Sequence, residues 1–154
     1  MQRATTSFLC ISAATLISLG ILLATQNSSA AEPPDAKMME GTWLPLKAEL
    51  GGQPMPDNVL KSITLKLGDG KYAVTVGAAP DNGTYSIDPK TNPKSMSVTG
   101  TEGPNKGRTF PAIYELEGDT LRICYDLSGQ KRPAEFKSIA GTKLYLVTYR
   151  RQKE

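Results

Sequence analysis

The sequence ITLKLGDGKYAVTV, residues 63–76, decides the fold, because two independent features of it predict the same β-hairpin. Asp-Gly is a preferred pair for a two-residue turn whose residues both have positive φ. With the turn at Asp69 and Gly70, apolar side chains face one another across the two strands. The pairs are Leu67 with Tyr72, Leu65 with Val74 and Ile63 with Val76. The intervening residues are mostly polar, so one face of the hairpin is expected to be buried and the other to meet water.

Residues 113–124, IYELEGDTLRIC, predict a second hairpin in the same way. A turn at Gly118-Asp119 brings further apolar pairs together on one face. These pairs are Leu116 with Leu121 and Tyr114 with Ile123. On the other face Glu115 lies opposite Arg122, and a cross-strand ion pair of this kind helps to fix the register.

Working outward, short alternating runs separated by Gly, Pro, Asn and Asp predict about eight antiparallel strands. We expect them at Thr42 to Leu50, Ile63 to Leu67, Lys71 to Val76, Gly83 to Asp88, Ser95 to Thr99, Thr109 to Glu117, Thr120 to Asp126 and Lys143 to Arg150. Ala134 to Ser138 is a candidate ninth strand, and Pro56 to Ser62 a candidate helical turn. The fold class is therefore all-β. A closed up-and-down barrel buries one face and removes the edges, whereas a two-sheet β-sandwich is the alternative.

The N-terminus has the pattern of a secretory signal peptide over residues 1–31. Arg3 precedes an apolar run, and small residues then allow cleavage after Ala30 or Ala31. We expect an exported protein, periplasmic or extracellular, with a flexible leader over residues 32–40 and the barrel over 41–151. The alternative is an uncleaved N-terminal membrane tether, because the apolar run approaches the length of a membrane-spanning helix.

Composition narrows the classes of function. The chain has no histidine, which excludes histidine-ligated zinc and the Ser-His-Asp and Cys-His arrangements. A net charge of +3 with scattered charges gives no nucleic-acid or membrane-binding surface beyond the signal segment. Cleavage would leave one cysteine, Cys124, expected as a buried apolar residue. We therefore expect no enzyme, metal or cofactor, and an enzyme ranks third among the hypotheses.

Gly41-Thr42-Trp43 opens the first strand, and Arg150-Arg151 closes the last. The pair resembles the lipocalin pattern, in which a tryptophan plugs one end of the barrel and an arginine covers its indole. That resemblance implies a closing role for Trp43 and for Arg150 or Arg151.

Residues 101–108, 113–124 and 132–136 carry a more specific resemblance. They resemble the signature of a planctomycete-type lipocalin-like domain family of small exported proteins of uncharacterised function, over residues 41–150. The resemblance implies a lipocalin-like barrel and no catalytic residues. Pro45 departs from the family pattern and predicts an edge or a bulge in the first strand.

The preferred hypothesis is a binding protein that holds a small apolar or amphipathic molecule inside the barrel. The residues predicted to surround it are Leu65, Val74, Tyr85, Met96, Tyr114 and Ile123. Tyr72 and Tyr125 are further candidates whose hydroxyls could orient a polar group. The alternative is a filled barrel that acts as a protein-interaction or inhibitor module through the loops Thr101 to Arg108 and Leu127 to Pro133.

Overall fold

The computed structural model describes residues 34–153. The predicted signal peptide and its cleavage sites lie outside the described residues. Neither helix within residues 34–153 has the length and apolar character needed to cross a bilayer.

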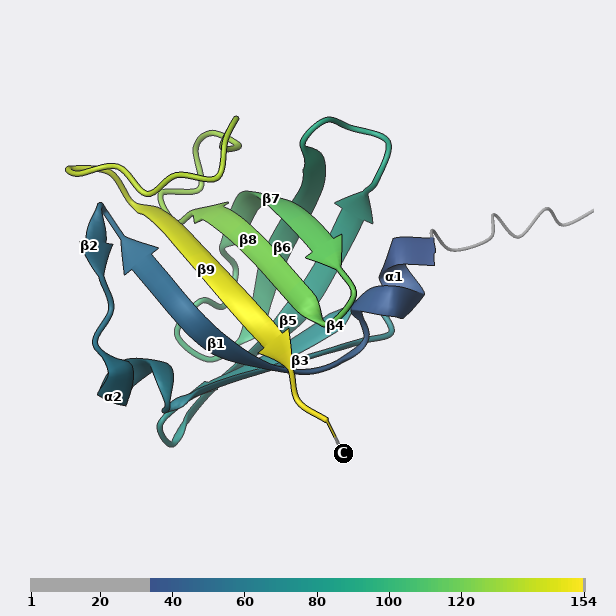
Figure 1. The fold of residues 1–154 in the computed structure, drawn as a ribbon, viewed down its shortest axis with the longest axis horizontal. Helices are drawn as coiled ribbons and strands as arrows, with labels where there is room; N and C mark the ends of the chain where they lie inside the picture. The colour runs from purple at the N-terminus through teal and green to yellow at the C-terminus, as the bar shows by residue number, and fades with distance from the viewer. Residues whose placement is uncertain (1–33, 154) are drawn as a thin grey trace, which may run out of the picture. The chain divides into compact units, whose positions relative to one another are not determined.

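The strands form one antiparallel sheet that closes on itself (Figure 1). The elements are α1 (Pro34–Met39), β1 (Gly41–Leu50), β2 (Gln53–Pro54), α2 (Asp57–Leu60), β3 (Ile63–Gly68), β4 (Lys71–Val76), β5 (Ala79–Asp88), β6 (Lys94–Glu102), β7 (Thr109–Glu117), β8 (Thr120–Asp126) and β9 (Leu144–Arg151). Consecutive strands from β3 to β9 are neighbours, and β1 pairs with both β3 and β9. The prediction of an eight-stranded up-and-down barrel is confirmed, and the short β2 pairs antiparallel with the end of β1.

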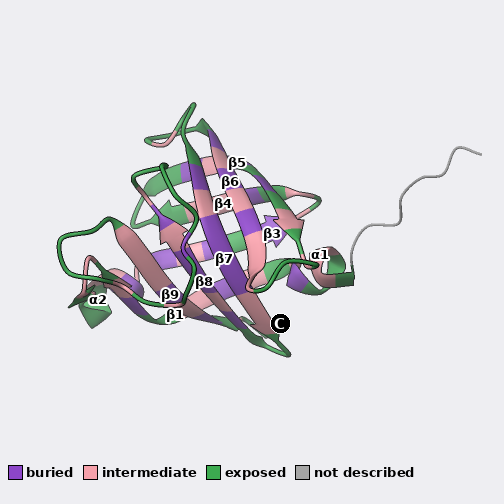
Figure 2. Ribbon diagram, turned by 90° about the horizontal axis from the view of Figure 1, so that it is seen from above, coloured by how far each residue is buried: buried purple, intermediate pink, exposed green. Residues whose placement is uncertain are grey.

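Both predicted hairpins are confirmed in register. Asp69 and Gly70 have φ values of 49° and 68°, and Leu65 lies opposite Val74 as expected. In the second hairpin, Arg122 and Glu115 form an ion pair of 2.6 Å on the outer face. Burial along the strands alternates accordingly, as Figure 2 shows by residue.

The predicted irregularity in the first strand is a β-bulge. The register between β1 and β9 shifts between Pro45 and Lys47, where Pro45 pairs with Tyr149. Leu46, the extra residue, is 53% exposed. The bulge bends β1 at the place where proline cannot donate a ladder hydrogen bond, so β1 can pair with β3 at its start and with β9 along its length.

One end of the barrel is closed by α1 and Trp43. The indole N–H of Trp43 donates to the Met39 carbonyl over 2.9 Å, and both side chains are fully buried. The Asp35 carboxylate holds the helix to the barrel through Lys94 at 2.7 Å and the Tyr114 hydroxyl at 2.8 Å. The expectation of a flexible leader is therefore wrong for residues 34–39. Pro33 and Pro34 suggested a leader, yet proline is compatible with the first position of a helix.

Arg151, and not Arg150, covers the tryptophan. Its guanidinium carbon lies 4.2 Å from the Trp43 ring, and its nitrogens also donate to the carbonyls of Glu40 and Met38. Arg150 is exposed. Side chains alternate between the two faces of a strand, and Arg151 is the residue that pairs directly with Trp43, so Arg151 lies on the same face as the indole.

The connection between β8 and β9 covers the outside of the barrel. Ile113 and Cys124 form a cross-strand pair that is almost completely buried although it lies outside the interior cluster. The Phe136 ring packs over Arg122 at 4.3 Å, and the Cys124 thiol lies 3.5 Å from the Lys137 carbonyl. The candidate strand at 134–138 is not formed, because this segment packs through side chains and turns and joins no ladder. Cys124 is buried, as expected.

Candidate binding cavity

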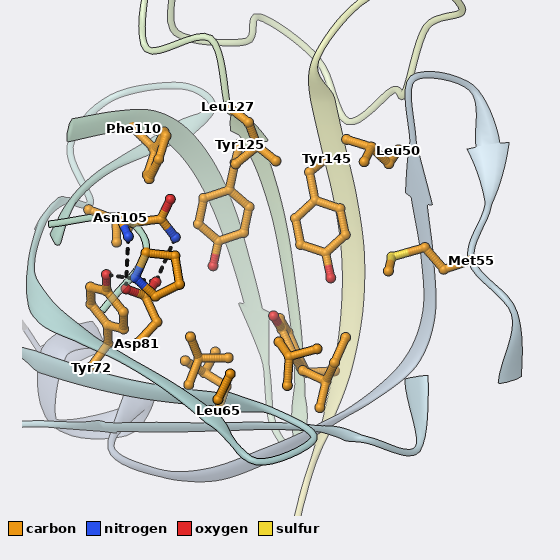
Figure 3. A pocket seen from close by; sticks show the side chains of 17 residues that line it. Leu50, Met55, Leu65, Tyr72, Asp81, Asn105, Phe110, Tyr125, Leu127 and Tyr145 are labelled. Atoms are coloured by element: carbon orange, nitrogen blue, oxygen red, sulfur yellow. Dashed lines mark hydrogen bonds between the residues drawn. The ribbon is translucent and has the colours of Figure 1, made fainter. Parts of the chain in front are cut away.

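A cavity of about 350 Å³ opens at the end of the barrel opposite α1 and Trp43. Strands β1 and β3 to β9 contribute to its wall, together with residues that follow β2, β6 and β8, and Figure 3 shows the lining side chains. Its lining is Leu50, Met55, Ile63, Leu65, Tyr72, Val74, Val76, Ala79, Asp81, Val98, Pro104, Asn105, Phe110, Tyr125, Leu127, Tyr145 and Tyr149. An enclosed apolar cavity of about 150 Å³ accommodates benzene, so this volume suits a somewhat larger molecule.

The interior is filled by side chains at one end and holds the cavity at the other. Side chains near Trp43 fill the barrel, among them Leu121 and Ile123, which are fully buried. Toward the mouth, Val76 and Leu50 are 49% and 42% exposed. Apolar side chains that remain open to solvent at a concave site are typical of a ligand-binding pocket.

Three tyrosines from β8 and β9 form one wall. The rings of Tyr125 and Tyr145 stack with centroids 5.8 Å apart, and Figure 3 shows their hydroxyls pointing the same way into the barrel. Burial raises the pKa of Tyr145 to about 12, against a smaller opposing contribution from its hydrogen bond with Tyr149. Burial likewise raises the pKa values of Tyr125 and Tyr149. All three are neutral phenols near pH 7, so they offer hydrogen bonds without charge.

The opposite wall holds a buried carboxylate. Asp81, 8% exposed, accepts hydrogen bonds from the side-chain amide of Asn105 at 2.7 Å, and from the Tyr72 hydroxyl and the Asn105 backbone N–H at 3.4 Å each (Figure 3). Burial, followed by the charge of Asp81 and its hydrogen bond, raises the pKa of Tyr72 to about 12. Tyr72 approaches this position because it packs directly on Gly83, its cross-strand partner. Among the described residues of the lining, Asp81 is therefore the one acidic group, and the others are uncharged.

The loops that follow β6 and β8 form part of the opening of the cavity. Pro104 and Asn105 come from the loop after β6, and Leu127 follows β8. Arg108 ties them together, since its guanidinium donates to the Leu127 carbonyl at 2.9 Å and to the Asn105 side chain at 3.4 Å. The loops that the sequence offered as an interaction surface thus border the cavity.

The six predicted ligand contacts separate into two groups. Leu65 and Val74 line the cavity. The other four, Tyr85, Met96, Tyr114 and Ile123, do not line it and are buried in the interior cluster. The alternation of apolar and polar residues along the strands predicts which side chains point into the barrel. It does not indicate which end of the barrel those side chains fill. The Tyr114 hydroxyl, for example, is engaged by Asp35 of α1, the element expected to be a leader.

Sequence reasoning missed Asp81, Asn105, Tyr145 and Tyr149. The alternation of Tyr145, Val147 and Tyr149 along β9 would have indicated the two tyrosines as inward-facing. Asp81 lies outside the expected strands, which leave residues 77–82 unassigned, whereas β5 begins at Ala79. Across residues 34–153, no three Cys, Asp or Glu side chains gather in a way that could hold a metal ion.

Comparisons with known proteins leave the family open. No family model and no curated protein match the chain, so the resemblance to a planctomycete-type family is not supported by them. Among solved structures, a DUF4847 family protein from Bacteroides vulgatus is similar over 75% of this chain and 94% of its own, at 13% identity and a TM-score of 0.45. That similarity is too low to support an argument about function.

Proposed function

We propose that this protein is a non-enzymatic, lipocalin-like binding protein that holds one small apolar or amphipathic molecule in the cavity at the open end of the barrel. The observation that carries the proposal is the cavity of about 350 Å³, lined mainly by aliphatic and aromatic side chains. Ligand pockets commonly have this combination of apolar walls and a few convergent polar groups. The neutral hydroxyls of Tyr125, Tyr145 and Tyr149 supply hydrogen bonds that would orient the ligand.

We also propose that binding takes place outside the cytoplasm. This rests on the signal-peptide pattern in residues 1–31. The absence of histidine from the whole chain favours binding over hydrolytic catalysis.

The competing hypothesis is a filled barrel that recognises a protein through its loops. A filled barrel would not contain the cavity beside Leu65 and Val74, so the cavity favours the binding hypothesis. The same loops remain at the mouth, where they would control entry of a ligand.

Native mass spectrometry of protein purified from its natural source tests the proposal. We expect a population heavier than the mature chain by the mass of one small molecule, which organic extraction removes. Protein that stays at its bare mass, and that also takes up none of a panel of apolar molecules, would contradict the proposal.

A further inference from the structure

We propose that the ligand carries a positively charged amine, and that Asp81 is the residue that recognises it. This inference rests on the proposed function, because it specifies the chemistry of a molecule bound in the same cavity. It starts from the fact that, among the described residues that line the cavity, Asp81 is the only one with a charged side chain.

Asp81 is held by hydrogen bonds and has no cationic partner among the described side chains. Its oxygens accept from Tyr72 and Asn105, which are both uncharged donors. Within residues 34–153, no lysine or arginine forms an ion pair with it. Buried carboxylates are ordinarily paired with a cation, because desolvation of the charge is costly. A cationic ligand group would supply the missing counter-charge.

The rest of the lining suits the same group. Tyr72, Phe110, Tyr125, Tyr145 and Tyr149 surround the cavity, and aromatic faces attract cations. Part of the rise in the pKa of Tyr72 comes from the charge of Asp81, after the larger effect of burial, and this is consistent with a negative potential at that wall. An amine with an apolar body therefore finds both of its parts complemented.

An anionic ligand is disfavoured by the same arrangement. Within the part of the chain that the structure describes, neither lysine nor arginine lines the cavity. Arg108 contacts lining residues but is exposed, and its guanidinium is engaged by the Phe110 ring at 4.7 Å, the Leu127 carbonyl and the Asn105 side chain. A carboxylate in the cavity would face Asp81, and like charges repel strongly at a poorly solvated site.

The preference for an amine is tested by calorimetric titration at pH 7 with three compounds that share a naphthalene ring and differ in their polar group. They are 2-(1-naphthyl)ethylamine, 2-(1-naphthyl)ethanol and 1-naphthylacetate. We expect the amine to bind at least about tenfold more tightly than the alcohol, and the carboxylate to bind most weakly, since a charged hydrogen bond in a poorly solvated site is worth this much or more.

Two variants place the preference on Asp81. Asp81→Asn keeps the size of the side chain, and we expect it to remove at least about tenfold of the amine's affinity while the alcohol binds as before. Glu102→Gln is the matched control, because Glu102 is an exposed carboxylate at the end of β6 that lies outside the cavity lining. We expect this variant to retain the preference.

The outcomes separate the two proposals. If none of the three compounds binds, the proposed function fails. If they bind with equal affinity, if the carboxylate binds best, or if Asp81→Asn retains the preference, the amine inference is wrong while the binding function stands. If Asp81→Asn does not fold, the order of the three compounds on the unmodified protein decides.

Discussion

Arg151 lies over the indole of Trp43 with its guanidinium carbon 4.2 Å from the ring, and the two residues are direct partners across β9 and β1. The same guanidinium donates to the carbonyls of Glu40 and Met38, next to the end of α1. One side chain thus joins the first strand, the last strand and the helix that closes the barrel.

Arg151→Ala should therefore lower the free energy of unfolding by about 2 kcal/mol, through loss of the cation–π contact and of the hydrogen bonds to the helix. Chemical denaturation followed by circular dichroism measures the change. Arg150→Ala is the control, because Arg150 is exposed, and should stay within about 0.5 kcal/mol of the unmodified protein. Equal losses in both variants would mean that Arg151 does not have this closing role.

Gly83 allows Tyr72 to reach Asp81. A methyl group at Gly83 would collide with the Thr99 carbonyl and with the Tyr72 ring. Gly83→Ala is expected to cost about 2–3 kcal/mol in unfolding free energy, because the strands cannot separate to accommodate it. In Gly68→Ala the new methyl group meets no atom within 4 Å, so thermal unfolding should show little change or a small gain. A stable Gly83→Ala variant would argue against the close packing of Tyr72 on β5.

The pH dependence of stability should report on Asp126, which is 6% exposed. Burial acts to raise its pKa, but hydrogen bonds from the Ser128 hydroxyl and from the backbone N–H groups of Ser128, Gln130 and Lys131 outweigh burial and lower it. A carboxyl group with a lowered pKa in the folded state stabilises the protein above the unfolded pKa of about 4, and this contribution is lost as the pH falls through the folded pKa.

Asp126→Asn should accordingly be less stable than the unmodified protein at pH 7, by about 1–3 kcal/mol, and the difference should shrink as the pH falls below about 4. Urea unfolding at a series of pH values measures it. Glu117→Gln, at an exposed site, serves as the control. A stability difference that is constant from pH 7 to pH 2 would show that the charge of Asp126 is not involved.

The thiol of Cys124 should react slowly with a chromogenic disulfide reagent in the native protein. Burial, the largest effect, and the nearby Asp126 raise its pKa, and this leaves little thiolate despite the opposing effect of a backbone hydrogen bond with Lys137. Phe136→Ala should speed the reaction at least about tenfold, since it weakens the segment over the thiol and raises the population of open states. Ile139→Ala, at an exposed position of the same connection, should leave the rate nearly unchanged. Equal rates in the two variants would contradict the covering role of Phe136.

Much of the barrel follows from local sequence. The turn at Asp69-Gly70 and the alternation on either side of it predict every pair of the β3–β4 ladder, because a shift by one residue would turn the apolar side chains outward. Pro45 likewise predicts the bulge in β1 from the chemistry of its backbone alone.

The site could not be predicted to the same extent, because it depends on contacts distant in sequence. The filled end of the barrel is covered by α1, and the sequence of that short helix has no local pattern that reveals its contact with Trp43. Asp81 follows Pro80 in a stretch typical of turns, and its role appears only when Asn105, from another connection, folds against it. Alternation therefore predicts inward-facing positions, whereas the structure places Tyr85, Met96, Tyr114 and Ile123 in the packed core and not in the lining of this cavity.

The central claim, that the cavity binds a small molecule, is tested most directly by filling the cavity. Val74 lines it, whereas the adjacent Thr75 is exposed and belongs to the opposite face of β4. Titration with the fluorescent probe N-phenyl-1-naphthylamine compares Val74→Trp with Thr75→Trp, after circular dichroism has established that both fold. We predict saturable 1:1 binding by the unmodified protein and by Thr75→Trp, and an affinity at least about tenfold weaker for Val74→Trp, because the indole occupies the space. Equal affinity in the two variants, or no binding by the unmodified protein, would contradict the account.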